Sequence, residues 1–355
     1  MLNFTVGPVM SNPDIIEVAN HSTPYFRTPE FSEIMKENER LFLDFLNAPE
    51  GSRAVFLTAS GTGAMESAVM NILNDEDRVI VINGGSFGHR FVELCELHQR
   101  NFTEVKCDFG HQLRREQLEG LEDHTAFLIN MHETSSGVLY DMKMVSQFCK
   151  ENNILLIVDA ISAFIADELD MTELGAAAVI TGSQKALAVQ PGISLIALAE
   201  AALERIENNK EVCMYLSLKQ ALKNGERGQT PFTPAVTTLL QINKRLRMIF
   251  DMGGVLEERK IIASVAEDFR SSIKDLQFEF VSESPSNAVT CLRPIHGGAK
   301  EIVRILKDEY DIWACPNGGE MADVVFRIGH IGFITKEDNH KLIDALHDMN
   351  QRGLL

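Results

Sequence analysis

Five short apolar runs separated by helix-like stretches constrain the fold more than any other feature of the chain. The runs are AVFLTA (54–59), RVIVING (78–84), AFLINMH (126–132), ILLIVDA (154–160) and AAVITG (177–182). Between them, AMESAVMNILN (64–74) and MKMVSQFCKENN (142–153) carry apolar residues at helical spacing. Strands that are apolar on both faces and alternate with helices predict a mainly parallel sheet covered by helices on both sides.

The pattern changes after QTPFTPAV (229–236). A long segment with helical spacing (237–276) follows, and short strand-like runs then mix with two helical stretches toward residue 355. Strands and helices in that order predict a smaller α+β domain. We therefore expect an α/β protein with a large domain over residues 1–245 and a small domain over residues 246–355.

Composition and charge argue against several classes of function. With 51 acidic and 33 basic residues, the formal net charge is −18, which disfavours binding to nucleic acid or to an anionic membrane. No apolar stretch reaches the roughly 18 residues that a spanning helix needs, and MLNFTVGPVM lacks a signal-peptide pattern. The six cysteines form no C-x-x-C pair and the ten histidines form no zinc motif. We expect a reduced, soluble, cytoplasmic protein without a metal.

Glycine and polar residues follow the first three predicted strands, at the sheet edge where α/β proteins bind ligands. SGTGAME (60–66) opens a helix, so the N–H groups of Ser60, Gly61 and Thr62 form either a phosphate site or only a tight turn. The segment does not fit the GxxxxGK[ST] or GxGxxG nucleotide motifs. Phe87 is either a flat surface for a ligand or a buried loop aromatic, and Thr134 is either a ligand hydroxyl or an ordinary loop threonine.

Asp159 and Lys185 follow the next two strands. A carboxylate directly after five apolar residues is costly to bury unless a cation pairs with it, although a helix N-cap is the simpler alternative. A lysine after a strand is usually solvated, but burial lowers the pKa of a lysine, and its neutral amine is able to form a Schiff base. An anion site, an aromatic ring, a carboxylate and an amine at successive strand ends predict a site for pyridoxal 5'-phosphate.

On these residues the chain resembles the class V aminotransferases of pyridoxal-phosphate fold type I, and among them the alanine–glyoxylate, serine–pyruvate and 2-aminoethylphosphonate–pyruvate group. The matching segments are GPV (7–9), RTPEF (27–31), SGTGAME (60–66), GGSFGHRF (84–91), HETSSGVL (132–139), VDAISA (158–163), GSQKAL (182–187), FTPAV (232–236) and FRIGHIG (326–332). They run over nearly the whole chain. The resemblance implies a mainly parallel seven-stranded sheet between helices and a smaller C-terminal domain.

The resemblance also implies which residues hold the cofactor ring. Lys185 would carry pyridoxal 5'-phosphate covalently as an internal aldimine, and Asp159 would pair with the pyridine nitrogen. Phe87 would stack on one face of the ring, and Ile161 would back the other face. Thr134 would contact the edge of the ring.

Phosphate and substrate contacts are implied in the same way. The phosphate would be bound by Ser60, Gly61, Thr62 and Gln184, and Gln184 would also touch the ring edge. A further hydroxyl would come from the partner subunit's Thr233, which implies a homodimer with composite active sites. Gly7, in an N-terminal segment (1–20) that contacts substrate, would lie along the substrate, and Arg327 would bind the substrate carboxylate by a bidentate fork.

The implied activity is a transaminase that moves an amino group from a small amino acid to a 2-oxo acid such as pyruvate or glyoxylate, with ping-pong kinetics. The chain departs from the family at two positions, and the role of a third residue stays open. Phe87 stands where some members have tryptophan, and the single tryptophan, Trp313, is far along the chain. Thr230 stands where some relatives carry a tyrosine toward the phosphate, and Arg27 is either a further anion contact or a structural loop residue.

Other activities remain open at this point. A 2-aminoethylphosphonate–pyruvate transaminase would need more basic residues near RTPEF to bind the phosphonate group, and Arg27 is the only candidate there. A pyridoxal-phosphate lyase shares the same cofactor residues. A cysteine desulfurase needs a mobile nucleophilic cysteine near Arg327, yet FRIGHIGF has none and Cys291 and Cys315 lack a glycine-rich loop. The amino donor, whether alanine, serine, aspartate or aminoethylphosphonate, is not set by the sequence.

Overall fold

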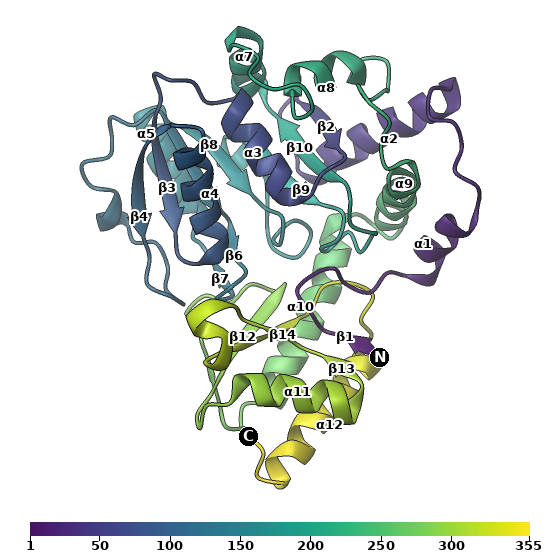
Figure 1. Ribbon diagram of the computed structural model, residues 1–355, viewed down its shortest axis with the longest axis vertical. Helices are drawn as coiled ribbons and strands as arrows, with labels where there is room; N and C mark the ends of the chain where they lie inside the picture. The colour runs from purple at the N-terminus through teal and green to yellow at the C-terminus, as the bar shows by residue number, and fades with distance from the viewer.

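Two β-sheets divide the molecule into a large and a small body, which helix α10 (Val255–Ser272) links along the chain (Figure 1). The computed structural model describes residues 1–355. The large body comprises the elements from α1 to α9 (Pro13–Asp251), and the small body comprises β1 (Leu2–Asn3) and the elements from β11 to α12 (Phe278–Gln351). None of the helices combines the length and the apolar composition that crossing a membrane requires.

The large body is built on a seven-stranded sheet in the order β2-β10-β9-β8-β5-β3-β4. Its strands are β2 (Arg53–Leu57), β3 (Arg78–Asn83), β4 (Asn101–Lys106), β5 (Ala126–Asn130), β8 (Leu155–Asp159), β9 (Ala176–Gly182) and β10 (Ser194–Leu198). The strands from β9 to β4 in this order pair in parallel, whereas β10 is antiparallel to both of its neighbours. The mainly parallel sheet predicted from the apolar runs is therefore confirmed.

Two of these strands, β4 and β10, have no counterpart in the sequence prediction. β4 has the sequence NFTEVK and lies at the edge of the sheet. Val105 is its only buried residue, so the strand lacks the apolar pattern that would predict it. β10 is only five residues long and fully buried. A short apolar run of this kind has no periodicity that would distinguish a strand from a helix.

Helices cover both faces of the large sheet, because alternate residues of a strand point to opposite sides. In β3, Ile80 and Ile82 join a core with α2, α5 and α9, while Val79 and Val81 join a second core with α3, α4, α7 and α8. The helices of the large body are α1 (Pro13–Glu17), α2 (Pro29–Phe45), α3 (Gly61–Asn71), α4 (Ser86–Leu97), α5 (Met142–Asn152), α6 (Met171–Leu174), α7 (Glu200–Asn208), α8 (Leu218–Gly225) and α9 (Val236–Asp251).

The long segment with helical spacing over residues 237–276 forms two helices in the structure. α9 ends at Asp251 and α10 begins at Val255. Gly253 and Gly254 lie between them with φ angles of +112° and +88°, which glycine adopts without the steric cost that a side chain would bring. The chain turns at this glycine pair and α10 leads into the small body.

The small body contains a four-stranded antiparallel sheet in the order β11-β12-β15-β14, which confirms the predicted α+β character of this part. Its strands and helices are β11 (Phe278–Phe280), β12 (Val289–Pro294), α11 (Ala299–Tyr310), β14 (Cys315–Pro316), β15 (Phe326–Gly329) and α12 (Lys336–Gln351). Phe4 belongs to the core of this body, because β1 pairs in parallel with β13 (Ile312–Trp313). A division into domains 1–245 and 246–355 remains a prediction.

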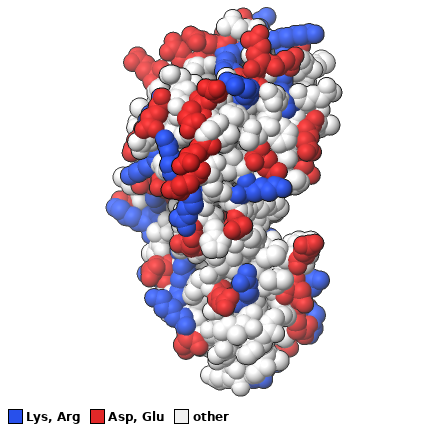
Figure 2. Space-filling view, turned by 90° about the vertical axis from the view of Figure 1, so that its left-hand side faces the viewer, with Lys and Arg blue, Asp and Glu red and all other residues white.

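Acidic and basic side chains are interspersed on the face shown in Figure 2, and the outline of the molecule narrows between the two bodies. The net charge of −18 is thus not gathered in one patch on this face. Its blue side chains are separated by red and white ones and form no continuous basic surface of the kind that binds nucleic acid.

Candidate active site

Most of the predicted site residues converge where β8 and β9 end and where α3 and α4 begin. β5, β8 and β9 run parallel, so their carboxyl ends share one edge of the sheet. A short hairpin, β6 (His132–Glu133) and β7 (Val138–Leu139), follows β5 and carries Thr134 at this edge. The small body faces the same region through β15, which carries Arg327.

Lys185 is buried just beyond the end of β9, with 7% of its surface exposed. Its Nζ atom donates a hydrogen bond to the carbonyl oxygen of Val6 at 2.6 Å and lies 5.9 Å from the centroid of the Phe87 ring. A Cβ atom on Gly7 would lie 2.7 Å from Cδ of Lys185, closer than real side chains approach. The N-terminal segment therefore packs directly on the lysine side chain, which agrees with the predicted place of Gly7 at the site.

Burial lowers the pKa of Lys185 to about 8, and the positive charge of Arg327 acts in the same direction. The charge of Asp159 opposes this shift. An amine with this pKa is partly neutral near physiological pH, and the neutral form is the nucleophile and base. The lysine is thus chemically competent, not an ordinary solvated charge.

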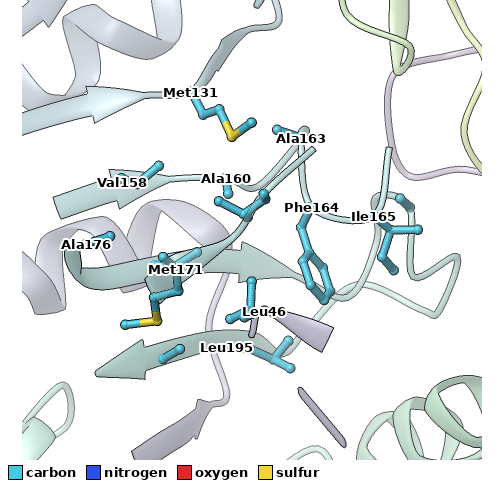
Figure 3. Close-up of a cluster of buried hydrophobic side chains, with 14 of the residues drawn as sticks. Leu46, Met131, Val158, Ala160, Ala163, Phe164, Ile165, Met171, Ala176 and Leu195 are labelled. Carbon is cyan, nitrogen blue, oxygen red and sulfur yellow. The ribbon is translucent and has the colours of Figure 1, made fainter. Parts of the chain in front are cut away.

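Asp159 is the last residue of β8 and is also buried. Its Oδ1 atom accepts a hydrogen bond from the backbone N–H of Ile161 at 2.8 Å, while Oδ2 has no hydrogen-bond partner. Burial raises the pKa of this carboxyl group to about 7. Val158 and Ala160, on either side of Asp159 in the chain, lie in the apolar cluster of Figure 3, so the carboxylate is held by a tightly packed support.

The predicted anion site lies at the first turn of α3. Ser60 is the exposed N-cap residue and Gly61 is the first helical residue, so free backbone N–H groups point out of this helix end. A Cβ atom on Gly61 would lie 2.3 Å from Cδ1 of Ile161. Gly61 and Ile161, both predicted cofactor contacts, are thus brought together by close packing.

Phe87 lies in the first turn of α4, and Arg90 completes this part of the site. The guanidinium carbon of Arg90 lies 5.2 Å from the centroid of the Phe87 ring, and Nη1 donates to the hydroxyl of Thr62 at 3.0 Å. The buried Glu133 carboxylate accepts hydrogen bonds from the backbone N–H groups of Phe87 and Gly88. These contacts fix the start of α4 and link the aromatic ring to the anion site.

Thr134 and Arg327 meet at the interface of the two bodies. The Thr134 hydroxyl donates to Oγ of Ser162 at 2.8 Å, and its carbonyl oxygen accepts from Nη1 of Arg327 at 3.2 Å. Nη2 of Arg327 donates to the carbonyl oxygen of Pro316 at 2.7 Å and to Sγ of Cys315 at 3.3 Å. Arg327 is buried, forms no ion pair, and its Nε atom has no partner. A buried guanidinium group without an anionic partner is able to bind a carboxylate.

Gln184 and Thr233 differ in how the structure places them. The carbonyl oxygen of Gln184 accepts a hydrogen bond from the N–H of Val9 at 3.3 Å, so this residue lies beside the N-terminal segment at the site. Thr233 is exposed and lines a surface pocket together with Thr58 and Pro231. Arg27 is also exposed and donates to the carbonyl oxygen of Pro231, so it lies near Thr233.

Four residues at or near the site were missed by sequence reasoning. Arg90 lies three residues after Phe87, a spacing that puts both on one helix face and could have revealed it. Val6 and Cys315 reach the site through contacts between distant segments, for which the sequence has no signal. His132 is fully buried with both ring nitrogens unpartnered; burial and the charge of Lys185 lower its pKa to about 3, so the ring is neutral.

The residues at this edge fit pyridoxal 5'-phosphate. The free Oδ2 atom of Asp159 is able to accept a hydrogen bond from a protonated ring nitrogen, and Lys185 offers an amine for the aldehyde. The first turn of α3 offers N–H groups for a phosphate. The Phe87 ring, with its centroid 5.9 Å from Nζ of Lys185, offers a flat apolar surface, and Trp313 lies in β13 beside β1.

Comparison with known proteins defines the family. A family model described as aminotransferase class-V matches residues 16–326. An uncharacterized aminotransferase of Helicobacter pylori is 29% identical, over 98% of this chain and 93% of that protein. The serine–glyoxylate aminotransferase of Arabidopsis thaliana is 29% identical, over 94% of this chain and 86% of that protein. The chain therefore belongs to the aminotransferase class V family and is an aminotransferase.

The fold is likewise that of a solved aminotransferase. An aspartate aminotransferase of subgroup IV from Thermus thermophilus superposes with a TM-score of 0.93, covering 99% of each chain, at 24% sequence identity. The predicted family, fold and enzyme class are confirmed by these matches.

Proposed function

We propose that this aminotransferase moves the amino group of a small amino acid to a 2-oxo acid of the pyruvate or glyoxylate type, with pyridoxal 5'-phosphate held on Lys185. The observation that carries the proposal is the buried Lys185 amine, whose pKa is lowered by burial and by the charge of Arg327 while the charge of Asp159 opposes the shift. The similarity to the Arabidopsis serine–glyoxylate enzyme supports the same class of substrates.

Each residue has a defined task in this reaction. Pyridoxal phosphate, when bound, supplies an electron-withdrawing ring that makes the α-proton of an amino acid acidic. Arg327 binds the α-carboxylate and thereby orients the α-carbon toward Lys185. The neutral Lys185 amine takes up the α-proton and later returns a proton, as a general base and then a general acid. Asp159 keeps a proton on the ring nitrogen.

The proposed phosphate site combines two protomers. Ser60, Gly61, Thr62 and Gln184 would come from one protomer, and Thr233, which is exposed, would come from the other. Tyr215 and Phe232 stack beside Thr233 with their ring centroids 5.5 Å apart, and Tyr215 is 55% exposed. Exposed aromatic surface of this kind is suited to a subunit interface. The proposal includes a cytoplasmic homodimer.

Absorption spectroscopy tests the function directly. The purified protein with added pyridoxal phosphate should show a visible absorption band, which should bleach with its amino donor in a panel of alanine, serine, aspartate and 2-aminoethylphosphonate. Lys185→Ala should remove the half-reaction, whereas the exposed-lysine control Lys341→Ala should not. Absence of the band with Lys185 intact would contradict the proposal. Sulfide release from cysteine, or loss of carbon from a donor, would instead indicate a desulfurase or a lyase.

Subunit mixing tests the composite site. In a mixed dimer of Lys185→Ala and Thr233→Val chains, one site would combine an intact lysine with an intact threonine from the partner. That site should bind pyridoxal phosphate as tightly as the unmodified protein, and more tightly than the Thr233→Val homodimer does. No gain on mixing, in a sample that light scattering shows to contain dimers, would place Thr233 outside the partner's site.

A further inference from the structure

Arg90 joins the predicted phosphate site to the predicted ring surface. Its Nη1 atom donates a hydrogen bond to the hydroxyl oxygen of Thr62 at 3.0 Å, and its guanidinium carbon lies 5.2 Å from the centroid of the Phe87 ring. Cation–π attraction holds a guanidinium group over an aromatic ring at this distance. The half-buried side chain of Arg90 is therefore fixed by contacts with both α3 and α4.

The hydrogen bond between Arg90 and Thr62 has only one possible direction. A guanidinium group carries N–H donors and no acceptor, so the Thr62 oxygen must be the acceptor. The O–H group of Thr62 remains free to donate, and it has no acceptor within the chain, not even the carbonyl oxygen one helical turn earlier that helical threonines often use. A directed O–H donor thus lies beside the free N–H groups at the start of α3.

Arg90 has no carboxylate partner that would explain it as a structural residue. Elsewhere in the large body, Arg100 forms an ion pair with Asp75 at 2.7 Å, and Arg205 forms one with Asp77 at 2.7 Å. Arg90 forms no ion pair, and Thr62 is the only side chain to which it donates a hydrogen bond. Its charge therefore remains uncompensated beside a free hydroxyl group, an arrangement that favours an anion.

We propose that Arg90 is a positioning residue, which turns the Thr62 hydroxyl toward the phosphate of pyridoxal 5'-phosphate and makes the site selective for the phosphorylated cofactor. The inference rests on the proposed function, because it takes Thr62 as a phosphate contact. A hydrogen bond to a charged group contributes more than one between neutral groups, so the orientation of this single hydroxyl group has a measurable effect on phosphate binding. Pyridoxal, which lacks the phosphate, gains nothing from this orientation.

Binding to the cofactor-free, full-length protein tests the inference. Dissociation constants for pyridoxal 5'-phosphate and for pyridoxal are measured from the visible band that each compound forms. Arg90→Met keeps an apolar contact with Phe87 but removes the donor, and Thr62→Val removes the hydroxyl group. Each variant should weaken binding of pyridoxal 5'-phosphate about 30-fold and change binding of pyridoxal by less than about threefold. Arg293→Met, which removes an exposed arginine of β12, should change neither constant.

A double-mutant cycle shows whether Arg90 acts through Thr62. Arg90→Met should add less than about threefold to the loss already caused by Thr62→Val, because the hydroxyl group that Arg90 positions is then absent. Arg90→Lys, which keeps a charge and a donor, should recover part of the affinity. Losses that multiply in the double variant would overturn the proposal, since Arg90 would then act on the phosphate without Thr62. Equal losses for pyridoxal and its phosphate would overturn it too, because a general structural role affects both.

Inorganic phosphate separates failure of this inference from failure of the proposed function. Phosphate added to the cofactor-free protein should raise the midpoint of urea unfolding, compared with chloride at equal ionic strength, and should raise it less in Arg90→Met. If no visible band forms with pyridoxal 5'-phosphate, the proposed function fails, and the phosphate comparison still decides the role of Arg90. If the band forms and Arg90→Met binds the cofactor as tightly as the unmodified protein, the function stands and the inference is wrong. Equal stabilisation of both proteins by phosphate would likewise overturn it.

Discussion

The Nζ atom of Lys185 donates a hydrogen bond to the carbonyl oxygen of Val6, 179 positions earlier in the chain, with an N–O distance of 2.6 Å. The same N-terminal segment is fixed to the small body, because the N–H of Gly329 donates to the carbonyl oxygen of Phe4 at 2.7 Å. Gly329 lies two residues after Arg327 on β15. Residues 4–7 therefore connect the strand that carries the guanidinium group to the amine of the large body.

Gly7→Ala should disturb this connection. Gly7 has a φ of +122°, and its new Cβ atom would lie 2.7 Å from Cδ of Lys185, so the substitution combines backbone strain with a clash. We expect the free energy of unfolding to fall by about 2 kcal/mol and the visible band to form more slowly with added pyridoxal phosphate. Denaturant unfolding and stopped-flow absorption measure the two effects.

Gly51→Ala is the matched control for Gly7→Ala. Gly51 also has a positive φ, +81°, but nothing lies within 4 Å of its new Cβ atom. Only the strain term, about 1 kcal/mol, should remain, with no change in the absorption band. A normal rate of band formation in Gly7→Ala would show that the N-terminal segment does not position the lysine.

Arg327→Lys should weaken binding of the amino donor while keeping the charge. A lysine is unable to reproduce the two parallel N–H donors of a guanidinium group, and the contacts to Thr134 and Pro316 would also be lost. We expect KM for the amino donor to rise about 100-fold, with a smaller fall in kcat. Arg293→Lys should change neither constant. A loss confined to kcat would place Arg327 in another role.

Gly61→Ala should damage the anion site through Ile161. The added methyl group would lie 2.3 Å from Cδ1 of Ile161, and either α3 or the loop after Asp159 must move. We expect a loss of about 1 to 3 kcal/mol in the free energy of unfolding and weaker binding of pyridoxal phosphate. Because Ile161→Val removes Cδ1, the double variant should recover much of the loss. Additive effects in this double-mutant cycle would rule out the proposed contact.

Much of the fold was predictable from local patterns in the sequence. Strands such as ILLIV are apolar on both faces because helices cover both sides of the sheet. The residue types of such a strand therefore indicate that it is buried on both faces. The glycine pair at 253–254 carried a readable signal for the break between α9 and α10, but the apolar spacing on either side obscured it. Strand β4 was not predicted, because it lies at the edge of the sheet and its polar residues do not show an apolar strand pattern.

The site was predictable only as far as it follows the sheet topology. Lys185, Asp159 and Phe87 could be grouped because parallel strands end at one edge. The contacts of Val6 with Lys185 and of Cys315 with Arg327 depend instead on how the small body packs against the large one. No local pattern encodes such a contact, since the two residues are joined by tertiary packing and not by spacing along the chain.

Asp159 should make the stability of the cofactor-free protein depend on pH. Its pKa is about 7 in the folded chain against an ordinary value of 3.8, so the folded state binds more protons between these two values. Its contribution to stability is therefore complete below about pH 4 and is lost as the pH rises through about 7. Lys185 has the opposite shift, from 10.5 to about 8, so its contribution is complete above pH 10.5 and is lost as the pH falls through about 8.

Asp159→Asn should remove the first of these two dependences. Urea unfolding between about pH 5.5 and 7 should show that the free energy of unfolding, relative to the variant, falls with rising pH by at most about 1.4 kcal/mol per pH unit. The control Asp275→Asn replaces an exposed carboxylate and should leave the slope unchanged. Pyridoxal phosphate should reduce the slope, because a protonated ring nitrogen beside Asp159 would lower the pKa of the carboxyl group. A variant with the same slope as the unmodified protein would show that Asp159 is ionised throughout this range.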